Sequence, residues 1–114
     1  MKNAREQNRR AIEGWLVTEV RIIAPDEGRG IDRDDVSVWT EIYRSSGEQM
    51  DALRNAIGEA YDDYYEGADI DQNDRYATVY AVMNERDPAS NTYSLTMGAF
   101  TYIWKLDTRM IQAD

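Results

Sequence analysis

The sequence predicts an α+β protein: an antiparallel sheet with one main helix packed on one face, and an additional helix near the N-terminus. Residues 48–66 repeat apolar side chains at steps of three and four, which is the spacing of an amphipathic helix. The segments 36–44, 75–85 and 93–105 alternate with the period of two that is typical of strands. A chain of 114 residues has the length of one domain, so we expect residues 1–114 to form a single α+β domain.

The N-terminal third is the least regular part of the sequence. In residues 4–23 the apolar residues fit a helical stripe, although the run WLVTEVRII also fits a strand. The stripe consists of Ile12, Trp15, Leu16, Val20 and Ile23. We expect a helix from Ala4 to Thr18 and then an extended segment that ends near Pro25. The stretch 25–35 contains two glycines and reads as a polar loop.

The central helix has recognisable ends. Met50, Leu53 and Ile57 begin its apolar stripe. Ser46 is a suitable N-cap, and Gly67 is a natural stop.

The last two alternating segments are separated by the turn sequence RDPASNT, and we expect them to form a hairpin. Alternation then divides the sheet into two faces. The face under the central helix is predicted to hold Val36, Val38, Ile42, Val79, Met83, Leu95, Met97 and Ile103. The opposite face is predicted to hold seven aromatics: Trp39, Tyr43, Tyr76, Tyr80, Phe100, Tyr102 and Trp104. Because so many aromatics are costly to leave in water, we expect a neighbouring subunit or the N-terminal segment to cover them.

The composition excludes several kinds of chemistry. There is no cysteine and no histidine, so disulfides, thiolates and the commonest general base are absent. The acidic pairs Asp34/Asp35 and Asp62/Asp63 have no evident partner for acid–base catalysis. We therefore expect no enzyme activity and no cofactor. No apolar run approaches the length of about 18 residues that a membrane span needs.

The sequence DIDQN, which starts at Asp69, resembles the first half of a calcium loop. An EF-hand loop also requires glycine at its sixth position and glutamate at its twelfth. These positions hold Asp74 and Tyr80, so we expect a solvated loop and no specific metal site.

Charge is distributed unevenly along the chain. Lys2, Arg5, Arg9 and Arg10 lie in the first ten residues, opposed only by Glu6, whereas the rest of the chain has a net charge of −12. We expect Arg5, Arg9 and Arg10 to contact an acidic part of a neighbouring copy. Together with Trp39, Tyr43, Tyr80, Phe100, Tyr102 and Trp104, they form the expected interface.

An alternative follows from the acidic side chains Glu59, Asp62, Asp63 and Glu66. On a helix they can form a row with the spacing of DNA phosphates. Small acidic phage proteins that inhibit restriction or CRISPR nucleases have this composition, so a DNA mimic is the rival interpretation.

A more specific resemblance covers residues 36–106. The strand-like segment Val36–Tyr43, followed by Met50–Ile57, resembles the strand and alanine-containing helix of phage tail terminator proteins. Asn84–Asp87, a turn and Tyr93–Tyr102 resemble the final hairpin of that family.

This resemblance implies a structural protein of the virion, assembled in the host cytoplasm. Its subunits would form a homomeric ring, usually a hexamer, that caps the tail tube and joins it to the head connector. Its partners would be further copies of itself and other tail or neck proteins. DNA would pass through the lumen without specific binding, which suits a negatively charged wall, and no membrane partner is expected.

Overall fold

The computed structural model describes residues 11–25 and 28–112. It shows the α+β class that the sequence predicts, with a four-stranded antiparallel sheet. The strands are β1 (Ala11–Ile23), β2 (Val36–Tyr43), β3 (Thr92–Met97) and β4 (Phe100–Gln112), in the spatial order β2-β1-β4-β3. The helices are α2 (Ser46–Tyr64) and α3 (Gln72–Asn84), with a short 3-10 turn, η1 (Arg33–Asp35), before β2.

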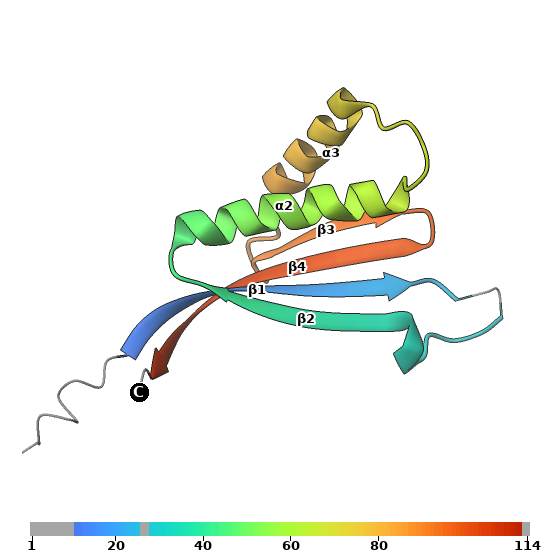
Figure 1. Ribbon diagram of the computed structural model, residues 1–114. Coiled ribbons are helices and arrows are strands. Elements are labelled where there is room, and N and C mark those ends of the chain that lie inside the picture. The colour runs from blue at the N-terminus through green and yellow to red at the C-terminus, as the bar shows by residue number, and fades with distance from the viewer. Residues whose placement is uncertain (1–10, 26–27, 113–114) are drawn as a thin grey trace, which may run out of the picture.

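Both helices lie on the same side of the sheet (Figure 1). The core between the two layers contains Leu53 and Ile57 from α2 and Trp104 from β4, each with no exposed surface. Val79 and Val82 of α3 join this core. Burial of these apolar side chains is the main force that fixes the helices on the sheet.

The expectation of a helix over residues 4–18 is wrong for residues 11–18, which belong to β1. Residues 4–10 lie outside the described part of the chain. β1 pairs with β2 on one side and with β4 on the other, so it is a central strand. These two neighbours satisfy its backbone hydrogen bonds and override the helical spacing of its apolar residues.

The predicted strand 75–85 is also wrong, because this segment is α3. The Asp71 side chain accepts hydrogen bonds from the backbone N–H groups of Asn73 and Asp74 and thereby caps the helix. Val79 and Val82 are three residues apart and face the core, whereas Tyr76 and Tyr80 stack on the exposed side.

The predicted hairpin between residues 75–85 and 93–105 is wrong, because its first segment is α3, and a different hairpin ends the described chain. It joins β3 to β4, and its turn interrupts the single strand that we expected over residues 93–105. Gly98 occupies the first turn position with a φ of +58°, a conformation that favours glycine.

The prediction for the central helix is confirmed with small shifts at its start. The N-cap is Ser45 rather than Ser46, and its side chain accepts from the Glu48 N–H. Gly67 lies in the turn after α2 with a φ of +84°, as expected for a helix stop.

Candidate functional site

For β2 and β4 the two faces of the sheet are the reverse of those that the sequence analysis assigned, whereas Leu95 and Met97 of β3 lie on the helix side as predicted. The pairs Glu19–Trp104 and Glu19–Trp39 place Trp104 and Trp39 on the helix side of neighbouring strands. Tyr102 and Trp104 are buried within the chain, and Phe100 is half-buried. The aromatic face is therefore covered by α2 and α3 of the same chain, so Tyr102 and Trp104 are not accessible to a neighbour in the folded subunit.

The other expected interface residues are scattered. Trp39 and Tyr43 lie at the β2 edge, with Trp39 42% exposed. Tyr80 is exposed on α3 and does not belong to the sheet. Arg5, Arg9 and Arg10 lie outside the described residues. The described members of the predicted interface thus do not lie on one surface.

The side of the sheet opposite the helices carries an aliphatic surface that the sequence analysis placed in the core. We call it the open face. Register pairs Leu16 with Ile42, and Val20 with both Val38 and Ile103, so these side chains share one side of the sheet. By alternation the open face comprises Val36, Val38, Thr40 and Ile42 of β2, Ile12, Leu16, Thr18, Val20 and Ile22 of β1, and Ile103, Lys105, Asp107, Arg109 and Ile111 of β4.

Three aliphatic residues of the open face are exposed to solvent, whereas Leu16 is buried by its neighbours. Val38 is 62% exposed, Ile42 58% and Ile12 52%. A Cβ atom built on Gly14 would lie 2.5 Å from Ile111 Cδ1 and 3.2 Å from Ile42 Cγ2, so these two isoleucines converge over the glycine. Aliphatic side chains thus run across β2, β1 and β4 without an interruption by charge on the first two strands.

The two threonines of the open face on β1 and β2 satisfy one another. The hydroxyls of Thr18 and Thr40 are 3.1 Å apart and form a hydrogen bond between β1 and β2. The charged positions, Lys105, Asp107 and Arg109, all lie on β4. The part formed by β1 and β2 could therefore be dehydrated with little loss of hydrogen bonding.

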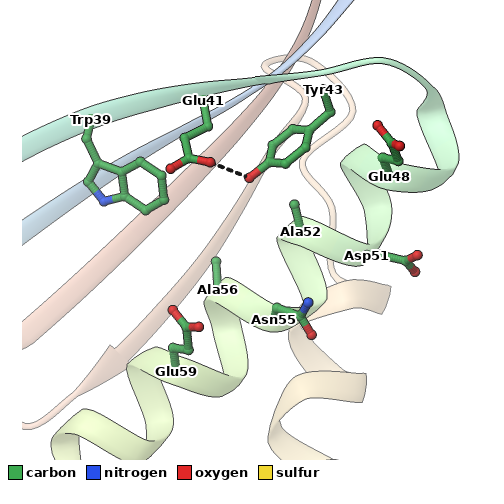
Figure 2. A pocket seen from close by; sticks show the side chains of 9 residues that line it. All are labelled: Trp39, Glu41, Tyr43, Glu48, Asp51, Ala52, Asn55, Ala56 and Glu59. Carbon is green, nitrogen blue, oxygen red and sulfur yellow. Dashed lines mark hydrogen bonds between the residues drawn. The ribbon is translucent and has the colours of Figure 1, made fainter.

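A second surface feature, the acidic groove, lies between β2 and α2 (Figure 2). It has a volume of about 570 Å3. Its carboxylates are Glu41, Glu48, Asp51 and Glu59, and none of the described residues that line it is basic. Trp39 and Tyr43 complete its β2 wall, and Ala52, Asn55 and Ala56 complete its helical wall.

The β2 wall of the acidic groove is held by hydrogen bonds. Tyr43 donates from its hydroxyl to Glu41 (3.0 Å), and burial, reinforced by this carboxylate, raises the pKa of Tyr43. The indole N–H of Trp39 donates to one Glu19 oxygen (2.6 Å), and that of buried Trp104 donates to the other (2.8 Å). Glu19 therefore connects the groove wall to the core.

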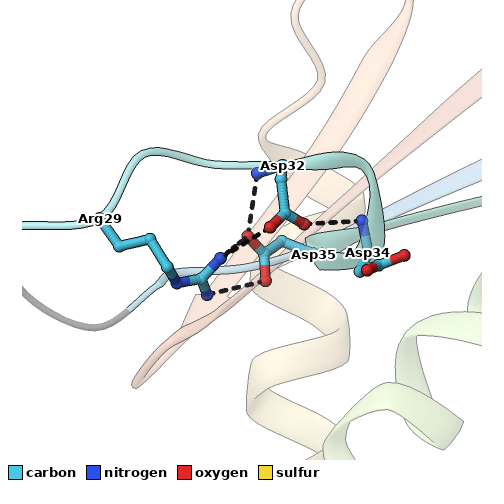
Figure 3. Close-up of polar contacts among 4 residues, drawn as sticks. All are labelled: Arg29, Asp32, Asp34 and Asp35. Atoms are coloured by element: carbon cyan, nitrogen blue, oxygen red, sulfur yellow. Dashed lines mark hydrogen bonds and ion pairs between the residues drawn. The ribbon is translucent and has the colours of Figure 1, made fainter.

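One member of each acidic pair that was considered for catalysis, Asp35 and Asp62, has a basic structural partner. Arg29 donates to both Asp32 and Asp35, and these hydrogen bonds join the loop to η1 (Figure 3). The Arg29 guanidinium lowers the pKa of Asp35, which stabilises its ionised form. Asp62 forms a two-bond ion pair with Arg75 that joins α2 to α3.

The calcium-like sequence also has a structural explanation, because Asp71 is the N-cap of α3. Within residues 11–25 and 28–112, no three aspartate or glutamate side chains gather into a cluster that could hold a metal ion. None of the helices in the described ranges has both the length and the apolar character needed to cross a membrane.

Comparison of the chain with protein-family models, curated proteins and solved structures finds no match. The resemblance to tail terminator proteins therefore stays a prediction. The open face is the feature that sequence reasoning missed. The alternation of Leu16, Thr18, Val20 and Ile22 could have indicated it, had residues 11–18 been assigned to a strand.

Proposed function

We propose that the protein is a non-enzymatic structural subunit that acts by self-association. Its specific role would be that of a phage tail or neck component, similar to a tail terminator, within the virion. The observation that carries the proposal is the open face, where aliphatic side chains of three adjacent strands lie on one side of the sheet. Two of these side chains, Val38 and Ile42 of β2, are each more than half exposed. Exposed apolar patches of this kind mark sites of protein–protein contact.

The element order supports the more specific role in part. The strand 36–43 followed by the helix 46–64 agrees with the first segment on which the resemblance rests. The second segment differs, because Asn84 ends α3 and residues 93–102 contain the β3–β4 turn. In the proposed ring, copies of the chain join one another and other tail or neck proteins. Carboxylates on the helix side, such as Glu59 and Asp63, would let DNA slide through the lumen without binding.

This role is tested by the copy number and position of the protein in assembled particles. Electron microscopy and quantitative mass spectrometry of particles should find several copies of the chain in a closed ring at the head–tail junction. Removal of residues 1–10 should loosen assembly and reduce its salt dependence, because that segment carries four of the basic residues. A single copy per particle would refute the ring.

The acidic groove favours a second candidate, an inhibitor of a nuclease with a basic DNA-binding site. Four carboxylates line the groove and of these only Asp51 is ion-paired within the described residues, with Arg54 at 2.9 Å, so a basic protein surface would complement it. The two candidates differ in their partner. Tight binding to a nuclease that is lost when Glu48 and Glu59 are replaced by glutamine would support inhibition, whereas the structural role predicts no such binding.

A further inference from the structure

We propose that the open face is the contact between two copies of this chain, which pack sheet against sheet about a two-fold axis. This inference deepens the proposed function and rests on its claim of self-association; because a two-fold contact closes on itself, a ring would join such pairs through a second surface. It specifies the surface, the partner and the symmetry. The result would be a four-layered pair, with the two sheets inside and the helices of each copy outside.

The chemistry of the open face fits another sheet of the same kind. On β1 and β2 its residues are valine, leucine, isoleucine and a hydrogen-bonded pair of threonines. β-branched side chains have few rotamers to lose when they are buried. Sheets with such faces pack about 10 Å apart, with their apolar side chains interdigitated.

The distribution of charge favours this arrangement over a head-to-tail contact. The chain has a net charge of −9, yet Asp107 is the one carboxylate among the open-face positions of β1, β2 and β4. A neighbour that docked its helix side on the open face would bury the four carboxylates of the acidic groove against aliphatic groups, which is costly. Sheet-on-sheet packing instead leaves both acidic layers in solvent and far apart.

The charged rim of the open face is compatible with two-fold symmetry. Lys105, Asp107 and Arg109 alternate in sign along β4. In an isologous contact a residue at the two-fold axis meets its own counterpart, and away from the axis a contact of one residue with another occurs twice, once in each direction. Asp107 of each copy can therefore lie near a cation of its mate, and no carboxylate has to face another carboxylate.

The size of the open face predicts the strength of the contact. Three strands about 4.8 Å apart, with eight paired residues at about 3.4 Å each, give a flat footprint of roughly 400 Å2. The four-residue extension of β1 and β4 beyond β2 brings this to roughly 500 Å2. A standard interface buries about 800 Å2 of accessible surface per partner. The accessible area of a surface is larger than its flat footprint, so the open face comes close to a standard interface without exceeding it. We therefore expect a reversible pair whose population depends on the protein concentration.

The first experiment uses two matched variants of the full chain. Ile42 lies on the open face and is 58% exposed, whereas Ile31 lies in the loop before η1 and is 60% exposed. Sedimentation equilibrium up to roughly 1 mM, which detects even contacts of about 4 kcal/mol, should show that the wild-type chain pairs. Ile42→Asp should weaken pairing by at least roughly 30-fold, because two-fold symmetry changes both sides of the contact. Ile31→Asp should pair as the wild type does.

A third variant guards against misfolding. Val38→Thr keeps the β-branched shape that strands favour, so it should leave the circular dichroism spectrum unchanged and still weaken pairing.

The second experiment tests the symmetry. The chain has no cysteine, so a single cysteine at Val20 or Val38 can be joined only to its counterpart in another copy. A short bismaleimide is required, since sheets about 10 Å apart exceed the reach of a disulfide.

Each outcome decides one claim. Self-linking at Val20 or Val38 but not at Ile31 supports the two-fold contact. A wild-type chain that stays monomeric throughout the concentration range overturns the inference. An oligomer that Ile42→Asp leaves intact also overturns it, while the proposed function of self-association stands. Conversely, pairing through the open face together with a single copy in particles would sustain this inference and refute the ring.

Discussion

Replacement of Gln49 by glutamate should destabilise the protein strongly at neutral pH and much less in acid. Gln49, near the start of α2, is 5% exposed. Its Nε2 group donates to the Leu16 carbonyl oxygen (2.9 Å) and to the Asp107 carbonyl oxygen (3.0 Å). The amide therefore fixes the first turns of the helix to both central strands. A carboxylate at this position has no donor and faces two acceptors.

The magnitude follows from these contacts. Loss of two hydrogen bonds costs about 1–3 kcal/mol, at about 0.5–1.5 kcal/mol each. Burial against two carbonyl oxygens raises the pKa of the introduced carboxyl, and a rise of 2–3 units adds about 3–4 kcal/mol. Since the folded pKa lies above the unfolded value of about 4.3, this added penalty is absent below that pH. It grows as the pH rises and is complete above the folded pKa, near pH 7.

Urea denaturation followed by circular dichroism, at several pH values from 4 to 8, measures this effect as a difference from the wild type. Gln49→Met is the control, because it removes both donors without adding charge; its loss of about 1–3 kcal/mol should not change with pH. Equal losses for the two variants at pH 7 would refute the argument. So would a glutamate penalty that does not shrink on acidification.

Three further predictions concern other polar contacts. Glu19→Ala should cost about 1–3 kcal/mol of unfolding free energy, because it leaves the buried indole N–H of Trp104 without an acceptor; unchanged urea stability would contradict this. Asp71→Ala should cost about 0.5–2 kcal/mol through loss of the α3 cap, with faster amide exchange confined to that helix, and calorimetry should detect no calcium binding to the wild type. The hydrogen bond from Arg29 lowers the pKa of Asp35 in the folded protein. The Arg29–Asp35 pair should therefore stabilise the fold above the unfolded pKa of about 3.9, and this stabilisation should be lost as the pH falls through the lower folded pKa. Asp35→Asn should remove that acid-dependent part, and parallel stability curves for variant and wild type below pH 5 would show that the pairing has no effect.

The sequence was sufficient where a segment's pattern and its surroundings agree. The strand 36–43 and the helix 46–64 have strong local periodicity, and the structure confirms both. Segment 75–85 alternates by coincidence, since its tyrosines are exposed on a helix whose buried residues are Val79 and Val82. The helical state of this segment is determined by the packing of α3 on α2 and by the N-cap at Asp71. Of these two, only the N-cap can be recognised from the local sequence.

The error in the two faces came from register, which a local pattern cannot specify. A shift of one residue exchanges the two sides of a strand, so both assignments of Trp39 and Val38 fit the same alternation. Once residues 11–23 form the central strand β1, Glu19 accepts from both Trp39 and Trp104 on the helix side. The aliphatic residues are then left on the open face. Gly98 inside the predicted strand 93–105 was a local signal for the β3–β4 turn that could have been used.

This correction changes which contact between copies is physically reasonable. β2 and β3 are the edges of the sheet, so two copies could also join through the free backbone groups of β2. Such edge pairing would extend the sheet and place two open faces side by side in water. It would double the exposed aliphatic surface that includes Val38 and Ile42, whereas packing of the open faces removes that surface from solvent. Edge pairing alone therefore leaves the apolar surface unexplained, and any assembly built through β2 would still need a partner for the open face.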